Sequence, residues 1–147
     1  MKYLKVAAFS SLVLLAGCTT ISNQWSLGKL FSFGHSNEEI QGMDAQKLFQ
    51  VPGPDLCAAY AGTHSPVIHK EIQRRSYVDS WSRVNSGKTW TGMNLCSLLA
   101  SQGKPDSVST FSGLMVLEYT NNHMTYELQP QSGSSKHINY HVRKIEH

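Results

Sequence analysis

Residues 115–128, MVLEYTNNHMTYEL, contain the pattern that decides the fold of this chain. Apolar and polar residues alternate on both sides of Asn121-Asn122, as they do in two half-buried strands joined by a turn. Asn suits a two-residue hairpin turn because it tolerates positive φ. The register set by that turn pairs apolar residues on one face, namely Tyr119 with Met124, Leu117 with Tyr126 and Met115 with Leu128.

A third strand is expected beyond a loop that runs from Gln129 to Lys136. Ile138, Tyr140 and Val142 alternate with polar residues, which again indicates one buried and one exposed face. The segment before the hairpin has helical spacing instead. The sequence therefore predicts an α+β fold in which short N-terminal helices pack on one face of a three-stranded antiparallel β-meander, since no other segment can cover that face.

Four short helices are expected before the hairpin. The first covers Asp55 to Tyr60 and stops at Gly62, and the second begins at Pro66 after a capping Ser65. In this second helix the spacing separates an apolar side from a charged side, with Val67, Ile68 and Ile72 on the first and Glu71 and Arg75 on the second.

The last two helices are marked by their predicted caps. Asp79 is expected to cap a helix that carries Trp81 and Val84 and ends at Gly87. Asn94 is expected to cap the final helix, which ends at Gly103 and has an apolar stripe of Leu95, Leu98 and Leu99.

The second face of the meander is predicted to be polar and exposed to solvent. Its candidate partner-binding residues are Glu118, His123, Glu127, His137, His141 and Arg143. His137 and His141 are four positions apart, which is roughly 13 Å along a strand. One metal ion cannot bridge that distance without a ligand from another strand, so no metal and no cofactor is expected.

The first residues resemble a bacterial lipoprotein leader. Lys2 and Lys5 precede an apolar run that is too short to span a bilayer, and Leu15-Ala16-Gly17-Cys18 resembles a lipobox. The resemblance implies a signal peptide over residues 1–17, cleavage before Cys18 and lipidation of Cys18. In Gram-negative lipoproteins an Asp after the lipidated Cys tends to retain the protein in the inner membrane. Thr19-Thr20 stand there in this chain, so the resemblance favours the outer membrane, with the body of the protein in the periplasm.

Residues 18–51 are then predicted to be the lipidated Cys and a flexible tether, and residues 52–147 the periplasmic α+β domain. Trp25 to Phe33 is an unusually aromatic part of that tether. It is expected to contact the membrane interface or a partner, or equally the surface of the protein's own domain.

The cysteine count leaves one pair besides Cys18. An oxidising periplasm favours a Cys57–Cys96 disulfide. Two buried free thiols are the alternative, because an unpaired Cys behaves as a small apolar residue. The chain has no C-x-x-C motif, which argues against a redox enzyme.

Charge and motifs exclude other classes of protein. The formal charge is +3, and removal of Lys2 and Lys5 with the leader leaves 3 − 2 = +1, too little for a nucleic-acid binder. No nucleophile elbow, zinc-protease motif, P-loop or dinucleotide fingerprint is present. The sequence therefore predicts that the protein is not an enzyme.

Two short motifs resemble the BamE-like (SmpA/OmlA) family of small outer-membrane lipoproteins. Gly92-Met93-Asn94 precedes the last helix and Gly103-Lys104-Pro105 follows it, and the resemblance extends over residues 92–142. It implies two helices on a three-stranded antiparallel sheet and an accessory role in outer-membrane protein assembly or envelope integrity. The chain departs from the family in its longer tether, its extra helices between Asp55 and Ser86, and the absence of a match to the family's partner-contact segment near the first strand.

These observations favour a non-catalytic scaffold or accessory subunit of an envelope complex, held at the membrane by lipid and bound to an envelope protein. An inhibitor or exclusion-type binding module is one alternative, and a component of a secretion or conjugation apparatus is another. An enzyme or ligand-binding protein would need a concave apolar pocket, for which the sequence gives no sign.

Overall fold

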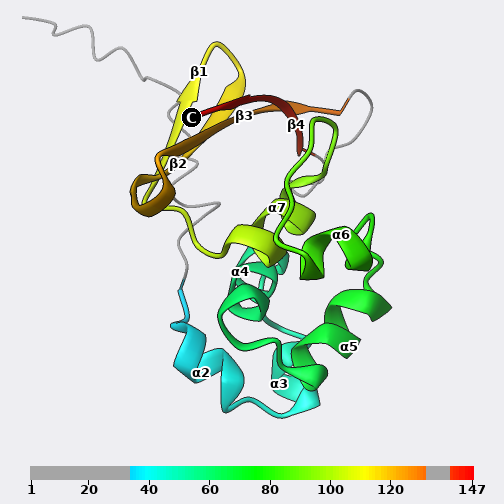
Figure 1. Ribbon diagram of the computed structural model, residues 1–147. Helices are drawn as coiled ribbons and strands as arrows, with labels where there is room; N and C mark the ends of the chain where they lie inside the picture. Colours follow the sequence, from blue (N-terminus) through cyan, green and yellow to red (C-terminus); the bar gives the residue numbers. More distant parts are fainter. Residues whose placement is uncertain (1–33, 132–139) are drawn as a thin grey trace, which may run out of the picture.

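The computed structural model describes residues 34–131 and 140–147 and shows an α+β fold, as predicted. The helices and the sheet occupy opposite ends of the molecule (Figure 1). The helices, in chain order, are α2 (Asn37–Gln41), α3 (Ala45–Leu48), α4 (Gly53–Thr63), α5 (Pro66–Arg74), α6 (Trp81–Asn85) and α7 (Leu95–Gln102).

The sheet has four antiparallel strands, so the prediction of three strands is wrong. They are β1 (Ser107–Phe111), β2 (Leu114–Tyr119), β3 (Met124–Pro130) and β4 (Tyr140–Glu146), and they lie in that order. The unexpected strand, β1, is mostly exposed and packs only Val108 against the core. A Ser112-Gly113 turn with positive φ at both residues joins it to β2, which suits a tight hairpin.

The predicted register between β2 and β3 is confirmed. Tyr119 pairs with Met124, Leu117 with Tyr126 and Met115 with Leu128. The turn differs from the prediction, because Thr120–Asn122 form a 3-10 turn, η1, and the positive φ of 55° falls on His123 rather than on either Asn. A four-residue connection from Thr120 to His123 preserves the register expected of the two-residue turn.

A β-bulge in β4 keeps its apolar residues on the core side. Glu127 pairs with Lys144 but Leu128 pairs with Val142, so Arg143 is the extra residue. The outer edge of β4 is also occupied, since the Val142 amide donates to the carbonyl of Met93 at 2.8 Å. Residues 132–139, which include His137 and Ile138, lie outside the described residues.

The helices form successive layers rather than a single cover on the sheet, which corrects the predicted packing. The main contacts join β4 to α7, α7 to α4 and α6, α4 to α2 and α5, and α5 to α3. Figure 1 shows the same order, with α7 nearest the sheet and α3 at the far end. The apolar residues of α7 and of β2 and β3 meet in one core.

The helix boundaries confirm some predicted caps and correct others. Asn94 caps α7 by accepting a hydrogen bond from the Ser97 amide at 2.8 Å, and Gly103 ends that helix as expected. The first predicted helix continues through Gly62 and ends at His64, whose φ is 49°. Asp79 does not cap α6, because its carboxylate binds Asn94 instead.

The folded part of the chain begins earlier than residue 52. Two short helices, α2 and α3, lie in the segment expected to be a tether, and Ile40, Leu48 and Val51 are buried in the core. Ser36 and Asp44 cap these helices through their side chains. Helices of four or five residues show less than two turns of periodicity, which is why the sequence pattern did not reveal them.

Candidate interaction site

The sheet-face residues predicted to bind a partner are only partly brought together. Glu118, Glu127 and His141 share the outer face, since their strand partners place them opposite the buried side. His123 lies in the turn after β2, and Arg143 is the bulge residue of β4. The sixth candidate, His137, is outside the described residues.

The polar side chains on this face interact with near neighbours. Glu118 accepts a hydrogen bond from the Ser107 hydroxyl at 2.5 Å, and Glu127 lies opposite Lys144. His141 Nδ1 is 2.9 Å from the carbonyl oxygen of Gly92. The face therefore has no single dominant charge.

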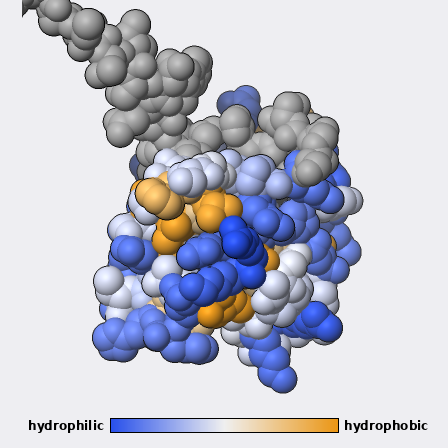
Figure 2. All heavy atoms as spheres, turned by 90° about the horizontal axis from the view of Figure 1, so that it is seen from above, coloured by the Kyte–Doolittle hydropathy of each residue, from blue (hydrophilic) through white to orange (hydrophobic). Residues whose placement is uncertain are grey.

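Apolar side chains on the sheet form small areas only. Phe111 is 75% exposed at the end of β1, beside the partly buried Leu114 and Val116 of β2. Figure 2 shows the molecule from the sheet end, where hydrophobic areas are separated by hydrophilic side chains.

A more distinctive surface lies at the other end of the molecule, between α3 and α5. It is an open groove of about 530 Å³, and we refer to it as the α3–α5 groove. Its lining residues are Ala45, Gln46, Leu48, Phe49, Val67, Lys70, Glu71 and Arg74. The last four recur at i, i+3, i+4 and i+7, so they form one face of α5.

The apolar part of the groove is exposed in an unusual way. Leu48 is buried at its base, whereas Phe49 is 63% exposed and Val67 is 49% exposed. Single exposed apolar residues are common on protein surfaces, but two that line the same groove indicate an interaction site. Val67 was predicted to lie on the buried side of its helix with Ile68 and Ile72, and the structure corrects this for Val67 only.

An ion-pair network forms the wall of the groove on α5. The Arg74 guanidinium donates two hydrogen bonds to Glu71, at 2.7 and 2.8 Å, and lies 4.9 Å from the centre of the Phe49 ring. Arg75 Nε donates to the same Glu71 carboxylate at 2.7 Å. The predicted Glu71–Arg75 pair is therefore present, but its side chains are only 10% and 11% exposed.

Arg75 also joins α5 to α3. Its two terminal nitrogens donate to the carbonyl oxygens at the end of α3, those of Val51 at 2.8 Å, Leu48 at 2.8 Å and Phe49 at 3.0 Å. The Leu48 carbonyl also accepts from the Val51 amide at 3.1 Å, and Arg75 adds a side-chain donor to it and to the carbonyls of Phe49 and Val51 beyond the end of the helix. One side chain thus satisfies the end of α3 and fixes it against α5.

The electrostatics of this network favour an ionised Glu71. The hydrogen bond from Arg74, reinforced by Arg75, lowers the pKa of Glu71 to about 2. Arg74 and Arg75 therefore share one carboxylate, and the groove lining, which contains Lys70, Glu71 and Arg74 but not Arg75, has a net charge of 2 − 1 = +1. Lys70 is exposed and makes no ion pair within the part of the chain that the structure describes.

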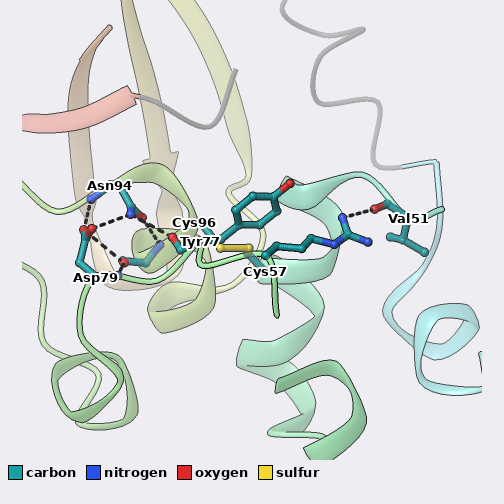
Figure 3. The surroundings of a disulfide bond; sticks show 8 residues. Val51, Cys57, Tyr77, Asp79, Asn94 and Cys96 are labelled. Atoms are coloured by element: carbon teal, nitrogen blue, oxygen red, sulfur yellow. Dashed lines mark hydrogen bonds between the residues drawn. A yellow bond between two sulfur atoms is a disulfide. The ribbon is translucent and has the colours of Figure 1, made fainter. Parts of the chain in front are cut away.

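The helices behind the groove are held by a covalent link. Cys57 on α4 and Cys96 on α7 lie at disulfide-bonding distance, with their Cα atoms 5.4 Å apart (Figure 3). Both residues are buried. This linkage joins the central pair of helices.

A polar network continues from the disulfide towards α6. The side chain of Asn94 donates to Asp79 at 2.8 Å and to the carbonyl of Tyr77 at 2.9 Å (Figure 3). The Asp79 amide in turn donates to the buried Ser97 hydroxyl at 3.0 Å. Asn94 thus organises the loop before α6 as well as the start of α7.

One acidic side chain is buried without full hydrogen bonding. Asp55 on α4 is 2% exposed, and its Oδ2 atom has no hydrogen-bond partner. Burial raises the pKa of this carboxyl group above its ordinary value. A lone buried carboxylate of this kind is not a general acid and base pair.

Sequence reasoning missed the groove because its two walls come from distant segments. Phe49 was assigned to the tether and Val67 to the buried side of α5. The recurrence of Val67, Lys70, Glu71 and Arg74 on one helical face was the available signal.

Searches against models of protein families, curated proteins and solved structures found no match to this chain. Residues 34–131 and 140–147 contain no cluster of three or more His, Cys, Asp or Glu side chains suited to a metal ion. Within those same ranges, every helix is too short or too polar to cross a bilayer.

Proposed function

We propose that this protein is a non-catalytic accessory subunit of a cell-envelope complex, anchored to the outer membrane by lipid on Cys18. The observation that carries the proposal is the α3–α5 groove, where Phe49 and Val67 are exposed beside the largely buried Glu71–Arg75 ion pair. Exposed apolar side chains within a rigid, charged surround are typical of protein-interaction sites.

The resemblance to BamE-like lipoproteins supports the envelope location and the accessory role. It rests on Gly92-Met93-Asn94 and Gly103-Lys104-Pro105, which flank α7 in the structure. The fourth strand and the helices that form the groove are additions to what that resemblance implies. The partner therefore need not be the one that such proteins bind.

The partner proposal is tested by photo-crosslinking in cells that produce the full-length protein. A photoreactive amino acid replaces Val67 in the groove, Phe111 on the sheet face, or Lys88 as an exposed control. We expect one envelope protein to be captured from Val67 and not from Lys88. Capture of no envelope protein from either Val67 or Phe111 would contradict the accessory role.

The anchor is tested separately with Cys18→Ala in the full-length protein. We expect the wild type in the outer-membrane fraction and the variant in the periplasmic extract, because acyl chains supply the membrane affinity. A variant that stays in the membrane fraction would refute the lipid anchor.

A further inference from the structure

We infer that the α3–α5 groove binds an amphipathic helix of a protein partner, with acidic residues along the margin of its apolar face. The inference rests on the proposed function and names the partner's chemistry. It follows from the shape of the groove, its hydrogen-bonding groups and its charge.

The shape suits a short helical segment. The nine residues of α5 give a wall roughly 13 Å long, about the length of two and a half helical turns. Phe49 and Val67 lie on opposite walls, so one apolar stripe can contact both of them. Apolar residues at i, i+3 or i+4, and i+7 supply such a stripe.

Hydrogen bonding favours a helix over an extended segment. Both walls of the groove are helical, and Arg75 occupies the terminal carbonyls of α3. An extended peptide finds no strand edge there, so its backbone groups would lose water without gaining partners. A helix satisfies its own backbone groups before it docks.

Charge determines which kind of helix fits. Lys70 and Arg74 lie along the wall on α5 with Glu71, so the lining has a net charge of +1, and the Glu71 carboxylate is already bound by two arginines. Carboxylates beside the partner's apolar stripe can approach Lys70, whereas lysines there would be repelled. The groove therefore selects an acidic amphipathic helix over a basic one.

A drug-sized ligand or a membrane surface fits less well. Small-molecule pockets enclose most of their ligand and offer unpaired polar groups, whereas this groove is open and its charges at Glu71 and Arg74 are engaged with each other. A flat membrane surface would contact Phe49 and Val67 but would not match the concave shape of the groove, which has Leu48 buried at its base.

The test is fluorescence anisotropy with the full-length protein and two labelled peptides of about 18 residues, which is five helical turns. Both have the same apolar stripe, and they differ only in having Glu or Lys at its margins. We expect the acidic peptide to bind at least roughly tenfold more tightly, and added salt to reduce this difference. Failure of both peptides to bind, or equal binding, would overturn the inference.

Two groove variants and two matched controls locate the binding. Lys70→Glu should abolish the preference for the acidic peptide and is stabilised by Arg74 at i+4, while Lys88→Glu should leave it unchanged. Val67→Glu should abolish binding and suits the first turn of α5, while Phe111→Glu should have no effect. A preference that survives Lys70→Glu would contradict the inference.

Vesicles that contain anionic phospholipid provide the remaining comparison. If the protein binds these vesicles and Val67→Glu abolishes that binding, the groove binds a membrane surface rather than a helix. In the crosslinking experiment, capture from Phe111 but not from Val67 would leave the accessory role intact and overturn the groove inference alone.

Discussion

Removal of the Cys57–Cys96 disulfide should lower the free energy of unfolding by about 4 kcal/mol. The two cysteines are 39 positions apart, so the bond closes a loop of about 40 residues. In the chain-entropy model, a loop of that length restricts the unfolded state by about 4 kcal/mol at 25 °C. A small domain has only about 5–15 kcal/mol in total, so the loss is a large share of its stability.

Urea unfolding of the wild type and of the Cys57→Ala/Cys96→Ala variant is monitored by tryptophan fluorescence. Both proteins carry Cys18→Ser, so that the pair under test contains the only cysteines. The expected loss corresponds to a decrease in melting temperature of roughly 15–30 °C. Wild-type protein treated with a reductant is the control, because it loses the bond but retains both buried sulfur atoms.

A loss of less than about 1 kcal/mol in both the variant and the reduced wild type would refute a stabilising effect of the cross-link. A large loss in the variant with none in the reduced protein would show that packing of the sulfur atoms, rather than the cross-link, stabilises α4 against α7.

Three further predictions concern polar groups. Asn94→Ala should lower the free energy of urea unfolding by about 1–2 kcal/mol, because it removes the α7 cap and the Asp79 contact; Asn122→Ala, in an exposed turn, is the control. The pKa of Glu71 is lowered to about 2, so its ionised form stabilises the fold above the unfolded pKa of about 4.5. In acid titrations the wild type should lose roughly 1–2 kcal/mol of its free energy of unfolding between that pH and pH 2. Glu71→Gln should lack this transition. Asp55 has a raised pKa, so its protonation should stabilise the wild type as the pH falls from neutrality towards 4; a wild type and an Asp55→Asn variant with parallel stability curves over that range would contradict this.

The sequence predicted the parts of the fold that side-chain alternation determines. The β2–β3 register followed from matched apolar residues, since a shift of one position would have exposed Leu117 and Tyr126. β1 was missed because Val108 is its one residue that packs on the core, and backbone pairing with β2 defines it. The α2 and α3 helices were missed because each is shorter than two turns.

The candidate site depended on tertiary structure to a greater degree. Val67 is next to Ile68 in sequence but about 100° away around the helix, and that rotation separates the groove from the core. The contact of Arg75 with carbonyls 24 to 27 positions away has no signature in a single sequence. The sheet-face candidates were placed by their register, which could not show the contacts of Glu118 with Ser107 and of His141 with Gly92.

The link from Arg75 to α3 affects how strongly the groove can bind. A helix of four residues is unstable in isolation, because the cost of starting a helix is not recovered over one turn. Here α5 holds both the last carbonyls of α3 and the Phe49 backbone in place before any partner arrives. A partner therefore meets walls whose conformational entropy has already been lost on folding, so more of its contact energy appears as affinity.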